Sequence, residues 1–232
     1  MRTCRLELLQ ETTLAGQSAS FETLQIRSDS GPAQRFSDSV QRALDLILIA
    51  VAAPVWFPVL MAALALKLLM DGRPVLFRHI RLGQNGKPFV LYKIRTTPRE
   101  FQPGADDWTD DEFPPRTKFG SWLRRFDVDE LPQMWNVLRG DMSLVGPRPE
   151  MPAHVLRFAF SIPEYSRRMS VRPGITGLAQ VRGLRGDTSI HERLRSDLEF
   201  ISGRGPVLYA AILARTIWME ARLAIRQTIV SQ

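Results

Sequence analysis

The apolar residues of this chain are concentrated in one long run. From Leu46 to Leu66 the sequence LILIAVAAPVWFPVLMAALAL carries no charged side chain, and charged residues stand on both sides of it. A helix of this length is sufficient to span a bilayer. Pro54 and Pro58 lie in the middle of the run, and each removes a backbone donor, which disfavours a straight helix. The pattern therefore predicts a helix, a break at Pro54 and a second helix within residues 37–71.

Two membrane arrangements of this segment agree with the pattern. Arginines are present both before and after the apolar run, so the positive-inside bias gives neither end a reason to cross the bilayer. This distribution favours a re-entrant hairpin that enters one leaflet and returns to the same face. A kinked single span remains open, because membrane helices tolerate proline when neighbouring groups satisfy the freed carbonyls. A buried helix of a soluble protein is disfavoured, since the chain is too short to surround so long an apolar stretch.

The segments on either side of residues 37–71 differ in character. Residues 1–36 are rich in Ser, Thr and Gln and show no sustained apolar period, which predicts a flexible cytosolic tail. They do not resemble a secretory signal, because no apolar core follows the first basic residues. Residues 72–232 have the mixed composition of a globular domain.

Within residues 72–232 the pattern predicts a short β-hairpin followed mainly by helices. Strands near 75–81 and 89–94 flank a Gln-Asn-Gly-Lys turn. A helix-forming stretch follows, with a break near Pro132 and a stop at Gly140. The segment SIHERLRSDLEFI predicts a charged helix, and GPVLYAAILARTIWMEARLAIR predicts a C-terminal amphipathic helix. The fold class predicted is α+β and mostly helical: a re-entrant membrane hairpin joined to a small cytosolic domain with a short β-hairpin and interfacial amphipathic helices.

Charge and composition narrow the classes of partner. The net charge of +7 predicts an anionic partner, either nucleic acid, a phosphorylated metabolite or an anionic membrane surface. Only four of the 31 basic residues are lysines, and arginine is the side chain whose planar fork pairs with phosphate through two hydrogen bonds. Nucleic acid is disfavoured because no helix-turn-helix, zinc or RNA-binding motif is present. Cys4 is the only cysteine, which excludes a zinc site built from several cysteines.

Candidate chemistry is concentrated in the stretch FDVDELPQMWNVLRGDMSLVGPRPE. Asp129 and Glu130 are adjacent, and adjacent residues on a helix do not face each other, so the pair is not expected to share a proton. One carboxylate can act as a nucleophile while the other holds a metal ion or handles a proton. Arg124 and Arg148 lie nearby in the sequence, and carboxylate, Mg²⁺ and arginine together are typical of phosphoryl transfer. An ordinary helix-surface pair between Arg125 and Asp129 remains the alternative at this point.

The segments GKPFVLYKIRT, RTKFGSWLRR, DELPQMWNVLRGDMSLVGPRPE and VRPGITGLAQVRG resemble, in order and spacing, the bacterial sugar transferase family. The resemblance covers about residues 38–225. It implies a monotopic phosphoglycosyl transferase that transfers a hexose 1-phosphate from a UDP-sugar to undecaprenyl phosphate and releases UMP. It also implies a location on the cytoplasmic face of the bacterial inner membrane, at the first membrane step of surface glycan synthesis.

The resemblance also implies roles for individual residues. Asp129 is the expected nucleophile, which would carry a covalent phospho-sugar intermediate and contact Mg²⁺. Glu130 would serve an acid-base step or position the metal and the acceptor. The cationic positions expected to bind substrate phosphates are Lys93, Arg95, Arg124, Arg148 and Arg172.

Some features depart from the family or leave choices open. Pro54 matches the helix-breaking proline of the family, but Ala53 precedes it where many members carry serine, and Pro58 is an extra proline. The alternative function is a catalytically inactive membrane scaffold of a glycan assembly complex. The sequence does not distinguish the sugar of the donor, and it is compatible with a homodimer.

Overall fold

The computed structural model describes residues 32–101, 115–186 and 188–230, and its longest element is the helix α2 (Pro32–Asp71). Within the described residues, the stretch Asp38–Asp71 is the one helix long and apolar enough to cross a membrane, and only 11% of its most apolar part is buried. The predicted tail lies outside the described residues except for 32–36, which begin α2. The exposed apolar side chains of α2 include Ile47, Val51, Val55, Phe57 and Leu69.

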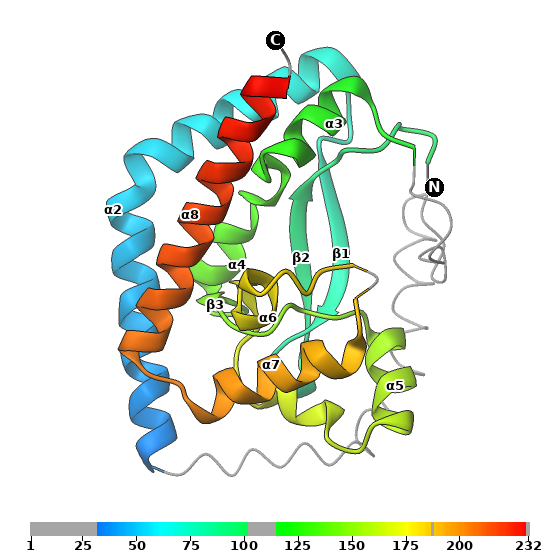
Figure 1. The fold of residues 1–232 in the computed structure, drawn as a ribbon. Coiled ribbons are helices and arrows are strands. Elements are labelled where there is room, and N and C mark those ends of the chain that lie inside the picture. The colour runs from blue at the N-terminus through cyan, green and yellow to red at the C-terminus, as the bar shows by residue number, and fades with distance from the viewer. Residues whose placement is uncertain (1–31, 102–114, 187, 231–232) are drawn as a thin grey trace.

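Helix α2 is bent rather than interrupted, which corrects the predicted break. The helix runs through both Pro54 and Pro58, and Figure 1 shows it rising along one side of the molecule and then turning across the top. Each proline removes one N–H bond to the carbonyl four residues earlier, but the flanking hydrogen bonds continue the helix. The indole Nε1 of Trp56 donates to the carbonyl oxygen of Ile49 at 3.0 Å. An indole thus contributes a hydrogen bond at the bend, where Ala53 has no hydroxyl to offer.

The predicted β-hairpin is confirmed. Strands β1 (Leu76–Leu82) and β2 (Pro88–Ile94) pair antiparallel from Leu76 opposite Ile94 to Leu82 opposite Pro88. The connecting 3₁₀ turn, Gln84–Gly86, has positive φ angles of 58° at Asn85 and 71° at Gly86. Asparagine and glycine are the residues that adopt this conformation most readily, which is why their pairing predicts a hairpin turn.

The predicted helical stretch after residue 116 forms two short helices separated by a turn. Helix α3 (Lys118–Arg125) begins at Thr117, whose Oγ1 accepts a hydrogen bond from the amide of Gly120 at 2.9 Å. A 3₁₀ turn, Val128–Glu130, then leads to α4 (Gln133–Arg139), which ends at Gly140 with a φ of 88°. The break near Pro132 and the stop at Gly140 are therefore confirmed, with the break extended into a turn.

Helix α4 is fixed to the hairpin by a buried amide. Asn136 Nδ2 donates to the carbonyl of Val90 at 2.7 Å, and Asn136 Oδ1 accepts from the amide of Tyr92 at 3.2 Å. Strand β2 thus acquires a side-chain partner on its free edge, and Asn136 links the hairpin to α4.

Two distant loops are held together by a short parallel pair. Strand β3 (Ser143–Val145) pairs with β4 (Gly174–Thr176), so the Gly-Pro-Arg-Pro turn after β3 lies against the Arg-Pro-Gly segment before β4. The amide of Gly174 donates to the carbonyl of Pro147 at 2.9 Å. A Cβ atom at Gly174 would lie 2.0 Å from the backbone nitrogen of Gly146, so only glycine permits this approach. The turn that carries Arg148 is fixed by this contact.

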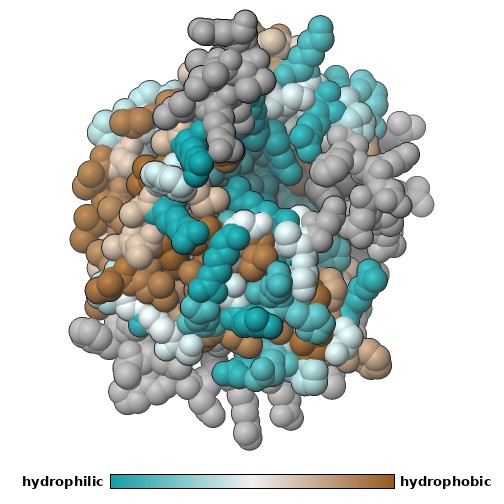
Figure 2. Space-filling view, in the orientation of Figure 1, coloured by the Kyte–Doolittle hydropathy of each residue, from teal (hydrophilic) through white to brown (hydrophobic). Residues whose placement is uncertain are grey.

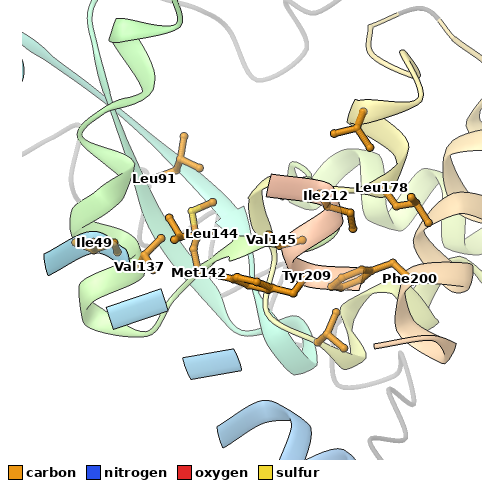
Figure 3. Packing of buried hydrophobic residues seen from close by; sticks show 12 residues of the cluster. Ile49, Leu91, Val137, Met142, Leu144, Val145, Leu178, Phe200, Tyr209 and Ile212 are labelled. Carbon is orange, nitrogen blue, oxygen red and sulfur yellow. The ribbon is translucent and has the colours of Figure 1, made fainter. Parts of the chain in front are cut away.

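The remaining helices complete one main core. They are α5 (Pro152–Ser161), α6 (Leu178–Val181), α7 (Ile190–Ser202) and α8 (Pro206–Val230). Figure 3 shows the core between α2, α4, β3 and the later helices, with Ile49, Val137, Val145, Phe200 and Ile212 among its members. Buried Asp45 of α2 joins this core through hydrogen bonds from the amide of Leu144 at 2.9 Å and the hydroxyl of Tyr209 at 2.7 Å.

The fold class agrees with the prediction in its main features: the described chain is mostly helical, with two small two-stranded sheets and one long apolar helix. The C-terminal amphipathic helix is present as α8. It buries Tyr209 and Ile212 and exposes Ile217 and Trp218.

Candidate active site

A cavity of about 740 Å³, lined by charged and apolar side chains, lies between the β-hairpin, the Val128–Glu130 turn, the Gly-Pro-Arg-Pro turn and helices α5 to α8. Figure 2 shows hydrophilic residues around a recess in this face and apolar residues gathered along the left edge. The basic residues that line the cavity are Arg81, Lys93, Arg116, Arg124, Arg148, Arg157, Arg168, Arg185 and Arg193. The acidic residues are Asp127, Asp129, Glu130, Glu150, Asp197 and Glu220. The lining is therefore rich in charge, with cations in excess.

The turn between α3 and α4 places Asp129 in the wall of this cavity. Asp127 reverses the chain with a φ of 50°, and Asp129 and Glu130 follow within one tight 3₁₀ turn. The carboxylate of Asp129 is fully buried, and its Oδ2 accepts a hydrogen bond from Arg124 Nη1 at 3.1 Å. Its Oδ1 is buried without a hydrogen-bond partner among the described residues. One carboxylate oxygen is thus positioned by a cation while the other is free of hydrogen bonds.

Glu130 has a different environment. Its Oε1 accepts hydrogen bonds from Lys93 Nζ at 2.6 Å and from Arg148 Nη2 at 3.3 Å. Burial alone would raise the pKa of Glu130, but the charges of Arg148 and Lys93 outweigh burial and hold this pKa well below its ordinary value. Glu130 is consequently ionised at neutral pH, and its position organises two cations from separate elements. The expectation that the adjacent carboxylates do not share a proton agrees with these separate partners.

The backbone at Arg148 is supported by a second arginine, Arg168. Arg168 donates to the carbonyl oxygen of Arg148 at 3.1 Å, and it also pairs with Glu150 at 3.1 Å and with Asp197 at 2.8 Å. The phenol of Tyr165 lies 2.7 Å from Arg168 Nη1. Burial lowers the pKa of an arginine, but Asp197 and the other neighbours outweigh it and raise the pKa of Arg168 above its ordinary value. Arg168 therefore fixes the backbone of the Gly-Pro-Arg-Pro turn.

The structure brings five of the seven predicted catalytic and phosphate-binding residues together and leaves two apart. Asp129, Glu130, Lys93, Arg124 and Arg148 all line the cavity.

Arg95 and Arg172 are not among the lining residues. Arg95 is 5% exposed and donates to backbone carbonyls at the end of α2 and in the adjoining loop, including those of Asp71 at 3.0 Å and Pro74 at 2.6 Å. Its guanidinium joins α2 to the hairpin, so its position does not support the expected phosphate contact. Pro54 lies in the bent helix α2, away from the cavity lining.

Sequence reasoning missed several residues of the cavity. Arg168 stands in a run of basic residues with no feature that distinguishes a buried arginine from a solvated one. Arg81 could have been found, because in the predicted hairpin it lies on the same face as Lys93. Asp127 stands close to Asp129 and Glu130 in the sequence, so the pattern gives no separate signal for it. Burial, assisted by the charges of Glu130 and Glu220, raises the pKa of the Asp127 carboxyl to about 6.

The metal-binding side chains of the described residues limit how Mg²⁺ would be bound. Within the described residues there is no group of three or more His, Cys, Asp and Glu side chains that could hold a metal ion. Mg²⁺ is commonly bound by one or two carboxylates together with substrate phosphates and water rather than by a protein cage. The carboxylate of Asp129, which lines the cavity and has one oxygen without a hydrogen bond, can supply one ligand of such a site.

Comparison with known proteins gives consistent matches. A UDP-glucose:undecaprenyl-phosphate glucose-1-phosphate transferase of Caulobacter vibrioides is 46% identical over 180 residues, which are 74% of this chain and 66% of that protein. A UDP-N-acetylgalactosamine-undecaprenyl-phosphate N-acetylgalactosaminephosphotransferase of Aeromonas hydrophila is 38% identical over 142 residues, 61% of this chain and 34% of that protein. The exopolysaccharide production protein PSS of Rhizobium leguminosarum is 39% identical over 190 residues, 78% of this chain and 94% of that protein.

These relatives differ in length. Two are named for transfer of a sugar phosphate to undecaprenyl phosphate, with different sugars, and the third is named for exopolysaccharide production. The family profile of the bacterial sugar transferases matches residues 36–222, which are nearly all of the described chain. The chain belongs to the bacterial sugar transferase family.

Proposed function

We propose that this protein transfers a sugar 1-phosphate from a UDP-sugar to undecaprenyl phosphate and releases UMP. The observation that carries the proposal is the buried carboxylate of Asp129, oriented by Arg124 and bearing one oxygen without a hydrogen bond in a cation-rich cavity. The names of the Caulobacter and Aeromonas relatives support the same reaction class.

The proposed reaction has two displacements at one phosphorus. In the first, Asp129 Oδ1 attacks the β-phosphorus of the donor, the bond to the bridging oxygen breaks, and UMP leaves with the electron pair. In the second, an oxygen of the lipid phosphate attacks the phosphorus of the acyl phosphate, and the carboxylate of Asp129 is released. The product is undecaprenyl diphosphate sugar. A carboxylate nucleophile divides one difficult transfer into two steps in this way.

The cations of the cavity balance the charge of two anionic substrates. Lys93 and Arg148 are held by Glu130 at 2.6 and 3.3 Å, so both side chains are positioned before substrate arrives. Arg124 orients Asp129 and offers further donors to phosphate. Because Glu130 is ionised, its role in this proposal is to position cations rather than to donate a proton. Mg²⁺ held by Asp129 and the donor diphosphate would supply further charge neutralisation as UMP leaves.

The apolar surface of α2 suggests association with a membrane. We place α2 in one leaflet of the bacterial inner membrane as a bent, re-entrant helix, with the cavity on the cytoplasmic face. The acceptor phosphate lies at the membrane surface, so a monotopic enzyme could bind it without extracting the polyprenol from lipid. The step would then begin the assembly of an exopolysaccharide, capsule, O-antigen or glycoprotein glycan.

The test is release of UMP by the purified full chain in nanodiscs, with undecaprenyl phosphate, Mg²⁺ and each of several UDP-sugars. We expect release with at least one donor and loss of release in Asp129→Asn. The matched control is Glu164→Gln, because Glu164 lies outside the cavity and its side chain is 60% exposed. Absence of UMP release with every donor would favour the inactive scaffold instead.

A further inference from the structure

One face of the β-hairpin forms a wall of the cavity. In the pairing of β1 with β2, Phe77 lies opposite Lys93, His79 opposite Leu91 and Arg81 opposite Phe89. Directly opposed residues of an antiparallel pair share a face, and residues two apart on a strand share it as well. Phe77, His79, Arg81, Leu91 and Lys93 all line the cavity. Arg81 therefore stands on the same wall as Lys93, roughly 13 Å further along the strand direction.

The guanidinium of Arg81 is not paired within the described chain. Its Nε is buried without a hydrogen-bond partner, and no carboxylate of the described residues lies within ion-pair distance of it. Glu150, an acidic neighbour of Arg81, is already bound by Arg168 at 3.1 Å and lies 3.8 Å from His154. Burial lowers the pKa of Arg81 to about 10, and the charge of Arg148 adds to this effect, while the charges of Glu150 and Glu130 oppose it without cancelling it. A partly buried cation without a partner is unfavourable unless an anion arrives to pair with it.

The position of Arg81 in the fold indicates which substrate brings that anion. At the Lys93 end of the hairpin, Ile94 packs with Ala63 of α2 and Leu123 of α3, near the exposed apolar residues of those helices.

At the Arg81 end, Leu82 packs instead with Val155 of α5 and Leu194 of α7, and its amide donates to the carbonyl of Glu150 at 3.1 Å. Figure 1 shows β1 running from the α3 side to the α5 side of the molecule. A lipid phosphate would arrive from the side of the apolar helices, which leaves the opposite end of the cavity for the water-soluble substrate.

We propose that Arg81 binds the phosphate of the nucleotide portion of the donor, the portion that leaves as UMP. The inference rests on the proposed function and adds to it a binding residue that the sequence motifs did not indicate. Arg81 extends the cation series of Lys93 and Arg148 toward the end of the cavity near α5 and α7. The unpaired charge of Arg81 lowers the stability of the protein when the cavity is empty, and the phosphate of the nucleotide neutralises this charge on binding.

The test compares Arg81→Met with Arg78→Met in the full-length protein in nanodiscs. Arg78 lies on the same strand but faces away from the cavity, over the ring of Tyr92 at 6.0 Å. UMP binding is measured by isothermal titration calorimetry, and thermal unfolding is followed without ligand. A short-chain polyprenyl phosphate is titrated in parallel, and Arg81→Lys tests whether a charge without the planar fork is sufficient.

We expect Arg81→Met to weaken UMP binding by about tenfold or more, the loss of a charge-assisted hydrogen bond. Unfolding without ligand should occur at an equal or higher temperature than in the wild type, and binding of the polyprenyl phosphate should be unchanged. Arg78→Met should leave both affinities unchanged, and Arg81→Lys should give an intermediate affinity for UMP.

Two results would overturn the assignment while leaving the proposed function intact: UMP affinity of Arg81→Met within about twofold of the wild type, or a loss confined to the polyprenyl phosphate. Absence of UMP binding by the wild type would instead overturn the proposed function, and this inference with it.

Discussion

Replacement of Arg168 by methionine tests how the Gly-Pro-Arg-Pro turn, which carries Arg148, is supported. The guanidinium is 6% exposed and pairs with Asp197 and Glu150, whose side chains are 3% and 14% exposed. Methionine fills similar space but removes the nearest cation of both carboxylates, and Glu150 keeps the more distant Arg193 at 3.9 Å and His154 at 3.8 Å. Removing one partner of a buried ion pair costs about 3–5 kcal/mol, because the remaining charge is neither solvated nor paired. For a chain of this length we expect the midpoint of unfolding to fall by roughly 6–20 °C.

A second substitution separates stability from function. In Arg168→Met with Asp197→Asn, one uncompensated charge is removed, so part of the lost stability should return. The carbonyl of Arg148 still lacks the donor that lay 3.1 Å away, so UMP release should remain low. Unfolding is followed by tryptophan fluorescence in nanodiscs, and UMP release is measured on the same samples. The reasoning is refuted if the single variant unfolds within about 1 kcal/mol of the wild type, or if the double variant is no more stable than the single one.

Three further substitutions test other parts of the account. Asp127→Asn should stabilise the protein at about pH 8 by up to ~1 kcal/mol, since the side chain is 45% exposed and solvent screens the effect. The raised pKa of about 6 means that the wild type loses stability as pH rises through 6, so a gain in unfolding temperature that stays constant down to about pH 4 would contradict it. Gly174→Ala should prevent stable folding, at a cost above about 4 kcal/mol, because the new Cβ would lie 2.0 Å from a backbone nitrogen of the facing turn. Gly205→Ala, with no atom within 4 Å of the new Cβ, is its control, and equal expression and unfolding temperatures would show that the contact is not tight. Trp56→Phe removes the hydrogen bond to Ile49 at the bend of α2 and should lower the unfolding free energy by about 0.5–1.5 kcal/mol; unchanged thermal unfolding would show that the bend does not depend on it.

The sequence predicts local elements of this fold well, because their signals are local. The Asn-Gly turn, the stop at Gly140 and the charged helix over 190–202 each depend on residues that are neighbours in the chain. The bend of α2 was harder to predict. The sequence shows the missing donors at Pro54 and Pro58, but not that the indole of Trp56 would bond to a carbonyl seven residues earlier.

The residues of the candidate site could also be predicted only in part from the sequence. Asp129, Glu130, Lys93, Arg124 and Arg148 follow from the motifs, and the structure places all of them at one cavity.

Arg95 belongs to the same motif as Lys93, yet its guanidinium turns back to the carbonyls at the end of α2. Arg168 and Arg81 enter the site through tertiary packing and strand register, respectively. The sequence shows that an arginine carries a positive charge, but the fold determines which group that charge pairs with.

The covalent role proposed for Asp129 is tested by intact-protein mass spectrometry after incubation with a UDP-sugar and Mg²⁺ in the absence of undecaprenyl phosphate. We expect an adduct with the mass of one sugar phosphate, located on Asp129 by peptide mapping and discharged when the acceptor is added. The adduct should be absent from Asp129→Asn. Release of UMP that occurs only with acceptor present, without any adduct on Asp129, would contradict a covalent intermediate and indicate direct attack by the lipid phosphate on the donor.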